Sequence, residues 1–318
     1  MAIAFTFPGQ GSQVVGMGKE LAQTFASAKA VFDEVDDALG ESLSTLIWEG
    51  PQEALTLTEN TQPALMATSM AVMAVLKDEY GIDVQAASHV AGHSLGEYTA
   101  LAAAGALTLG DAATLLRHRG QAMQRAVPVG MGTMAALLGA SEEQAIELCN
   151  LGSAHGVCEL ANDNAPGQVV ISGATEAIKA AAAAAKDHGV KKAVILPVSA
   201  PFHSSMMEPA AQEMEEALAD VTILTPKVPV VTNIAAAPTI NPQTIRRLLV
   251  EQITGRVHWR QGISWMVGNG VDTFVEPGAG KVLTLLVRRI SKDSKGVALN
   301  SPESIKDFAQ AFNAGEQE

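Results

Sequence analysis

The sequence predicts an α/β protein in which a large domain with a mainly parallel sheet carries a smaller inserted domain. Short apolar segments alternate with amphipathic helical segments along most of the chain, which is typical of a parallel sheet covered on both faces. A glycine-rich loop follows the first apolar segment, and a second apolar segment breaks sharply into a helix at GHSLG. Between residues 131 and 198 the order of segments changes to β-α-β-β-α-β.

The composition is that of a globular protein. The chain has 318 residues, of which 47% are hydrophobic, 17% charged and 4% aromatic. It is longer than a single hydrophobic core accommodates well, which favours a second, smaller domain. The net charge of -13 argues against a nucleic-acid partner, because phosphate neutralisation needs clustered Lys and Arg. An acidic protein partner would need a local basic patch, for which the candidates are Lys186, Lys191, Lys192, Arg246, Arg247, Arg256 and Arg260.

The cysteines and the N-terminal residues bear on metal binding and location. Cys149 and Cys158 are the only cysteines and lack the spacing of a zinc site, so we expect reduced, buried thiols and no metal. The opening MAIAFTFPGQGSQ has no basic region and breaks at Pro8, which predicts a strand entering a loop rather than a signal peptide. No apolar run reaches the length of a membrane span. We therefore expect a cytoplasmic protein with no membrane partner.

The first part of the large domain is predicted from apolar periodicity and from glycine and proline breaks. Strand 3–7 enters the loop 8–18, and strand 88–91 enters the helix that follows GHSLG. The helical segments predicted around them are 19–39, 52–57, 63–80 and 111–124.

The inserted domain follows a break near Pro128 and Gly130. Its predicted segments are strand 133–138, helix 141–151 with Ser141 as N-cap, strands 157–161 and 169–172 joined by NDNAPG, helix 175–188 and strand 193–198. This order is the ferredoxin-like arrangement. We therefore assign residues 131–198 to a ferredoxin-like subdomain, inserted between residues 1–130 and 199–318 of the large domain.

The large domain resumes near Pro201. Its predicted segments are helix 206–219, strand 228–231, helices 242–252 and 259–268, strand 273–275, a helix after EPGAGKVL, and a last helix with a tail after Ser301.

Ser94 is the candidate nucleophile. Gly92-His93-Ser94-Leu95-Gly96 matches the G-x-S-x-G nucleophile elbow and has the required strand before it and helix after it. The glycines permit a sharp turn that lifts the Ser94 hydroxyl out of the sheet, and the helix directs its N–H groups toward the site. The alternative is a serine that merely caps a helix.

His203 is the best candidate for the base that a serine nucleophile needs, because it lies in the loop SAPFHS after a predicted strand. No Asp stands at an obvious strand end between Ser94 and His203, so we expect a backbone carbonyl or an amide side chain to orient the imidazole. His93, beside the nucleophile, is expected to support the elbow.

The loop PGQGSQ follows the first strand, where a parallel sheet places ligand-binding loops. It is a candidate source of one oxyanion-hole N–H, with the second N–H coming from Leu95, directly after the nucleophile. It lacks the Lys-Ser/Thr ending of a phosphate-binding loop.

These motifs resemble the malonyl-CoA:acyl carrier protein transacylases and the acyltransferase domains of fatty-acid and polyketide synthases. The motifs that carry the resemblance, in the order of that family, are PGQGSQ, TQPAL, GHSLGE, RGQAM, APFHSSMM and PGAGKVL. The resemblance implies an α/β-hydrolase-like large domain with an inserted ferredoxin-like subdomain. It also implies malonyl transfer from malonyl-CoA to the phosphopantetheine thiol of acyl carrier protein, with no cofactor. The carrier protein could serve fatty-acid synthesis, a polyketide pathway or malonate decarboxylation. Of these we expect fatty-acid biosynthesis, and we expect a monomer.

The resemblance also assigns roles to individual residues. It implies Ser94 as nucleophile, His203 as base, and the backbone N–H groups of Gln10 and Leu95 as oxyanion hole. The Gln252 carbonyl would orient the histidine, and His93 would lie in the substrate site.

Selection of the malonyl group is implied for two further residues. Arg119 would pair with the free carboxylate of the substrate. Without the resemblance, the pattern of residues predicts that Arg119 is a solvated helix residue, and Arg117 would be an equally good candidate for binding a carboxylate. Phe202 would leave little room for a branch at the α carbon. Asn162-Asp163-Asn164 lies near a polar position of the family, without a clear alignment.

Two other classes of protein stay open at this point. A serine esterase or thioesterase shares the elbow and the base, but it would deacylate rapidly in water and does not need an arginine for a carboxylate. A scaffold that binds the carrier protein without chemistry would need neither Ser94 nor His203.

Overall fold

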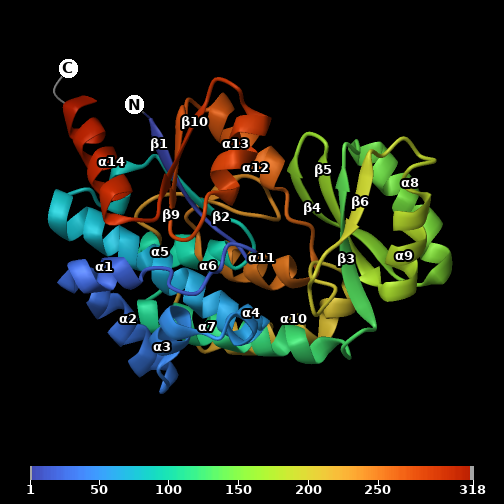
Figure 1. Cartoon of the computed structure of the whole chain (residues 1–318), viewed down its shortest axis with the longest axis horizontal. Coiled ribbons are helices and arrows are strands. Elements are labelled where there is room, and N and C mark those ends of the chain that lie inside the picture. Colours follow the sequence, from blue (N-terminus) through green and yellow to red (C-terminus); the bar gives the residue numbers. More distant parts are fainter. Residues whose placement is uncertain (1, 316–318) are drawn as a thin grey trace.

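The computed structural model describes residues 2–315, and its strands form two separate sheets (Figure 1). The larger sheet has the order β10-β9-β1-β2-β7-β8 and is parallel except for the β7–β8 pair at its edge. The smaller sheet has the order β4-β5-β3-β6 and is antiparallel. The prediction of an α/β protein with a mainly parallel main sheet is confirmed.

The strands of the larger sheet are β1 (Ile3–Phe7), β2 (His89–Gly92), β7 (Val230–Val231), β8 (Pro238–Thr239), β9 (Thr273–Pro277) and β10 (Lys295–Leu299). Its helices are α1 (Lys19–Thr24), α2 (Ala26–Leu39), α3 (Leu43–Glu49), α4 (Gln52–Thr56), α5 (Thr58–Tyr80), α6 (Gly96–Ala103), α7 (Leu109–Ala126), α10 (Glu208–Ala219), α11 (Pro242–Thr254), α12 (Trp259–Gly268), α13 (Val282–Ile290) and α14 (Pro302–Gly315), with the short 3-10 helices η1 (Val84–Ala86) and η3 (Ser205–Met207). Within residues 2–315, no helix combines the length and the apolar character needed to cross a bilayer.

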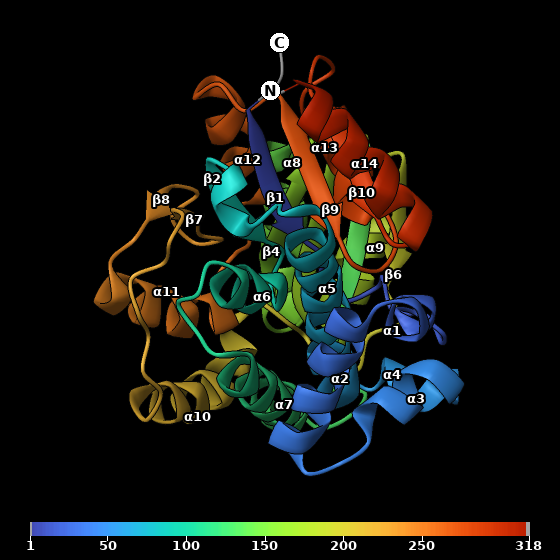
Figure 2. The ribbon, with the colours of Figure 1, turned by 90° about the vertical axis from the view of Figure 1, so that its left-hand side faces the viewer.

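The larger sheet is buried on both faces, as the continuous apolar character of β1 predicts. Successive side chains of β1 point to opposite faces: Ile3, Phe5 and Phe7 pack into the core formed with α2 and α5 to α7, whereas Ala4 packs against α12 and α13. Figure 1 shows α12 and α13 on one side of β1 and β9 and α5 on the other, and Figure 2 views these strands from the side of α5. The ends of β1 and β2 therefore meet at one edge of a rigid layer, where their loops form the site.

The smaller unit consists of β3 (Gly132–Leu138), α8 (Glu142–Gly152), η2 (Ser153–His155), β4 (Cys158–Ala165), β5 (Gln168–Ala174), α9 (Thr175–Ala184) and β6 (Lys192–Ile195). The predicted β-α-β-β-α-β order and the N-cap at Ser141, which forms a capping box with Gln144, are both confirmed. Cys149 and Cys158 are free thiols buried in the core of this unit, as expected.

Several predicted boundaries were wrong. The helix predicted over 19–39 is two helices, because Phe25 adopts an extended conformation between them while both present apolar faces to the same core. Helix α5 begins at Thr58 rather than at Pro63, and α9 ends at Ala184 rather than at 188. The short helix α3 and the partly exposed edge strand β10 were not predicted, because neither has a strong apolar period.

The segment NDNAPG is not a loop, as was predicted, because its first residues continue strand β4. The pairing of β4 with β5 shifts register between Leu160 and Asn162 and again between Asp163 and Ala165. Asn162 also forms a parallel bridge with Val257 of the large unit. The strand thereby brings residues of the small sheet to the edge of the large one.

Candidate active site

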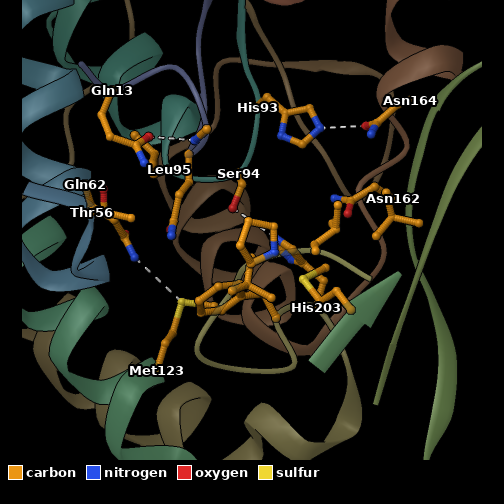
Figure 3. Close-up of a pocket in the computed structure, with 18 of the residues that line it drawn as sticks. Gln13, Thr56, Gln62, His93, Ser94, Leu95, Met123, Asn162, Asn164 and His203 are labelled. Atoms are coloured by element: carbon orange, nitrogen blue, oxygen red, sulfur yellow. Dashed lines mark hydrogen bonds between the residues drawn. The ribbon is translucent and has the colours of Figure 1, made fainter. Parts of the chain in front are cut away.

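Ser94 lies at the turn between β2 and α6, in the left-handed backbone conformation with φ of 54°. A Cβ atom on Gly92 would lie 1.8 Å from the Gly96 carbonyl oxygen, and one on Gly96 would lie 2.3 Å from the Phe7 carbonyl oxygen. Both glycines are thus required by close backbone approach. The turn directs the Ser94 side chain into a cavity (Figure 3).

His203 lies opposite the nucleophile. Its Nε2 is 2.8 Å from Ser94 Oγ, and its Nδ1 is 2.8 Å from the Gln252 carbonyl oxygen (Figure 3 shows the first contact). Because a carbonyl oxygen only accepts, Nδ1 carries the proton and Nε2 is free to take one from the serine. Burial, with the nearby Arg119 charge, lowers the His203 pKa to about 3. The imidazole is therefore neutral in the free protein.

Arg119 is buried, with 1% of its surface exposed, and not a solvated helix residue as its pattern on the helix had suggested. Its Nη2 donates to Ser94 Oγ at 3.1 Å and to Gln252 Oε1 at 2.8 Å, and its Nη1 donates to Gln62 Oε1 at 2.8 Å. The guanidinium also lies over the Tyr98 ring, 5.7 Å from the centroid. A cation thus stands next to the nucleophile at the wall of the cavity.

Arg117 takes no part in this site. The structure therefore distinguishes the two arginines that the sequence left as equal candidates for binding a carboxylate. Its guanidinium donates to the Glu59 carbonyl oxygen and to Asn60 Oδ1, and pairs with Glu41. Positions two apart on a helix point to nearly opposite faces. Only Arg119 faces the cavity.

The side chain of Gln252 and the carboxylate of Glu97 were not predicted as site residues. Gln252 Nε2 donates to Glu97 Oε2 at 2.7 Å and to the Ser94 carbonyl oxygen at 3.1 Å. Burial raises the Glu97 pKa to about 7, although hydrogen bonds and Arg119 oppose the rise. The sequence signal was a carboxylate in an apolar helical stretch directly after GHSLG.

The cavity has a volume of about 440 Å³ and lies between the two sheets. From the large unit it is lined by Gln10, Ser94, Leu95, Arg119 and His203 among others. Among the described residues, neither the Gln10 N–H nor the Leu95 N–H has an acceptor within hydrogen-bonding distance. Two backbone donors at the cavity wall are thus available to a ligand oxygen.

The small unit supplies the opposite wall. Because side chains alternate along β4, Asn162 and Asn164 face the cavity, whereas Asp163 faces away and binds Arg260. Asn164 Oδ1 accepts a 2.8 Å hydrogen bond from His93 Nε2 (Figure 3). His93 therefore connects the elbow to the small unit as well as lining the cavity.

The cavity also has an apolar wall, to which Phe202, Met123 and Met134 contribute. Phe202 precedes the histidine and is buried.

Three of the seven candidates for a basic patch form ion pairs within the protein. Arg256 and Arg260 are engaged by Glu142 and Asp163, and Arg247 is engaged by Glu251. The candidates near the junction of the two units therefore hold those units together rather than presenting free charge.

The arrangement is equipped for covalent acyl transfer. It combines a strained serine, a neutral histidine in contact with it, two backbone donors and a buried cation that can bind a carboxylate. In place of an acidic triad member, the histidine contacts a carbonyl oxygen.

The sequence and the fold of this chain are similar to those of known proteins. A family model described as "Acyl transferase domain" matches residues 4–310. A malonyl CoA-acyl carrier protein transacylase of Bacillus subtilis is 46% identical over 305 residues, covering 96% of this chain and 95% of the relative. The crystal structure of an acyl-carrier-protein-S-malonyltransferase from Bartonella henselae superposes with a TM-score of 0.96 at 52% identity, covering 98% of this chain and 100% of that one. A malonyl-transacylase in complex with a type II polyketide acyl-carrier protein superposes with a TM-score of 0.94 at 37% identity, covering 98% and 100% of the two chains.

Proposed function

This chain belongs to the family of acyl transferase domains, and we propose that it transfers a malonyl group from malonyl-CoA to the phosphopantetheine thiol of acyl carrier protein. The observation that carries the proposal is the buried Arg119, whose Nη2 lies 3.1 Å from the Ser94 hydroxyl. A planar guanidinium at that distance can bind the free carboxylate of a malonyl group bonded to Ser94.

In the first half-reaction, Ser94 Oγ attacks the thioester carbonyl carbon while His203 Nε2 takes the hydroxyl proton. The oxyanion that forms is stabilised by the N–H groups of Gln10 and Leu95. Collapse of this intermediate breaks the carbon–sulfur bond, and the coenzyme A thiolate leaves with the proton from His203. The product is a malonyl ester on Ser94.

The second half-reaction reverses these steps with a new thiol. The carrier's phosphopantetheine thiol gives its proton to His203 and attacks the ester, and Ser94 leaves with that proton. This is a ping-pong scheme in which one site serves both substrates. The apolar wall at Phe202 and Met134 disfavours water in the acyl-enzyme.

The partner is proposed from the relatives, one of which was solved in complex with an acyl-carrier protein. We propose that the reaction serves fatty-acid biosynthesis in the cytoplasm, that the chain acts as a monomer, and that it needs no cofactor beyond the coenzyme A thioester.

We also propose names and boundaries for the two units. The large unit, residues 1–130 and 199–318, is taken as α/β-hydrolase-like on the support of its parallel sheet and nucleophile elbow. The small unit, residues 131–198, is taken as ferredoxin-like on the support of its β-α-β-β-α-β order and antiparallel sheet.

A serine esterase or thioesterase is the competing function. Intact-protein mass spectrometry after brief mixing with malonyl-CoA or acetyl-CoA separates the two, when a phosphopantetheinylated carrier protein is added afterwards. Transfer predicts a malonyl adduct on Ser94 that persists in buffer and disappears onto the carrier. An adduct lost to water at the same rate without the carrier would favour the hydrolase.

A further inference from the structure

Asn233 holds the turn that carries the nucleophile, although it comes from a distant part of the chain. It follows strand β7, which lies beside β2 with Ala91 opposite Val231. Asn233, two residues beyond Val231, therefore reaches the turn that leaves β2. Asn233 is buried, with 3% of its surface exposed. The short β7 strand thus ends where the elbow begins.

Both polar atoms of the Asn233 side chain contact the elbow backbone. Oδ1 accepts a hydrogen bond from the Ser94 N–H at 2.8 Å, and Nδ2 donates to the Gly92 carbonyl oxygen at 2.7 Å. The backbone of Asn233 is itself fixed, since its N–H donates to Glu97 Oε2 at 3.1 Å and its carbonyl oxygen accepts from the His258 N–H at 2.9 Å. One amide therefore bridges the two sides of a left-handed turn.

The contacts on the other side of Ser94 complete the geometry. The Ser94 carbonyl oxygen accepts from Gln252 Nε2 at 3.1 Å and from the Glu97 N–H at 3.0 Å. In a trans peptide the carbonyl and the next N–H point in opposite directions. Anchoring the Ser94 carbonyl oxygen toward α6 therefore turns the Leu95 N–H toward the cavity. Because Asn233 engages the Ser94 N–H, that group is not available to the oxyanion.

We propose that Asn233 is a positioning residue for acyl transfer, which holds the Ser94 backbone so that the hydroxyl and the Leu95 N–H face the same thioester carbonyl. This inference rests on the proposed function. The role requires an amide: a carboxylate could accept from the Ser94 N–H but would face the Gly92 carbonyl oxygen without a proton to donate.

The test compares Asn233→Ala and Asn233→Asp with Thr232→Val. Thr232 is the matched control, because it is equally buried in the same segment and its Oγ1 has no partner among the described residues. The rate of Ser94 acylation is measured by single-turnover mass spectrometry with malonyl-CoA and with acetyl-CoA, below the unfolding midpoint of every variant.

We expect Asn233→Ala to acylate about 10²-fold more slowly with both thioesters, because both form the same oxyanion. Asn233→Asp should lose at least as much, and the KM for malonyl-CoA should change little.

Three results would overturn the inference: wild-type acylation rates in both Asn233 variants, an equal loss in Thr232→Val, or a loss confined to malonyl-CoA. If Asn233→Ala does not fold, the nearly isosteric Asn233→Asp decides the question by the same criteria. A wild-type protein that forms no adduct would instead count against the proposed function itself.

Discussion

Ser94 and His203 meet through a 2.8 Å contact between Oγ and Nε2, and each holds a positive backbone φ, 54° for the serine and 58° for the histidine. Such a conformation costs about 1 to 3 kcal/mol for a residue other than glycine. Contacts with surrounding residues must therefore hold both turns in these strained conformations. For Ser94 these come from Asn233 and Gln252, and for His203 from the Gln252 carbonyl oxygen.

Removal of the nucleophile gives the first prediction. Ser94→Ala is expected to abolish acyl-enzyme formation, with a loss of about 10⁶-fold in turnover, because no other hydroxyl contacts His203 Nε2 among the described residues. Its unfolding midpoint should stay close to that of the wild type. The measurement is intact-protein mass spectrometry with malonyl-CoA. A malonyl adduct that still forms on this variant at the wild-type rate would remove Ser94 from the mechanism.

Arg119 should determine the preference for a carboxylate-bearing acyl group. We expect Arg119→Ala to lose malonyl transfer by about 10²-fold more than acetyl transfer, because only the malonyl group has a carboxylate to pair. Arg119→Lys should recover only part of the loss, because an ammonium cannot form the two parallel hydrogen bonds.

Arg117→Ala is the matched control for Arg119, because Arg117 lies two residues away on the same helix and faces Glu59 and Asn60. Its ratio of malonyl to acetyl transfer should stay at the wild-type value. Equal losses of both activities in Arg119→Ala would argue against the carboxylate-binding role.

The base should stay neutral well below the pH at which a histidine usually protonates. Burial and the Arg119 charge lower the His203 pKa of the free protein from 6.5 to about 3, so the ratio of the acylation rate constant to the KM for malonyl-CoA, which reports ionisation of the free enzyme, should be nearly constant from pH 8 to pH 5. Single-turnover kinetics across this range provide the measurement. A tenfold fall for each pH unit below 6.5 would show that His203 has an ordinary pKa.

The sequence predicted those parts of the site that depend on local patterns. Ser94 and His203 each lie in a short motif after a strand, so their placement follows from chain order and the geometry of a parallel sheet. Arg119 could not be separated from Arg117 by pattern, because the choice depends on where α5 begins and which face of α7 it covers. Asn233 and the Gln252 side chain depend on contacts between residues more than 130 positions apart, which no local pattern contains.

Phe202 should restrict the size of the acyl group. It lines the cavity next to the base, so Phe202→Ser is expected to reduce discrimination against an α-methyl malonyl thioester by about tenfold, the worth of one methyl group in a tight apolar pocket. Competition between the two thioesters gives the ratio directly. Met123→Ala, which enlarges another part of the same wall, is the control and should change the ratio less.

Glu97 should make the stability of the fold depend on pH. Its pKa is raised from 4.5 to about 7, chiefly by burial. Between these values the folded state keeps a proton that the unfolded state releases, so acidification from pH 7 to pH 4.5 stabilises the fold through this group by at most about 1.4 kcal/mol per pH unit. This contribution is fully present below pH 4.5 and is lost as the pH rises through 7.

His203 acts in the opposite direction, since its lowered pKa makes the unfolded state bind more protons below pH 6.5. The two contributions oppose each other in the wild type, and only a comparison with Glu97→Gln isolates the carboxyl group, because that variant keeps His203. Denaturant unfolding of both proteins at several pH values should show the wild type gaining stability over Glu97→Gln as the pH falls from 7 toward 4.5. A difference that does not vary with pH would mean that Glu97 ionises at its ordinary pKa, and that the buried carboxyl group between Gln252 and Asn233 is charged near pH 7.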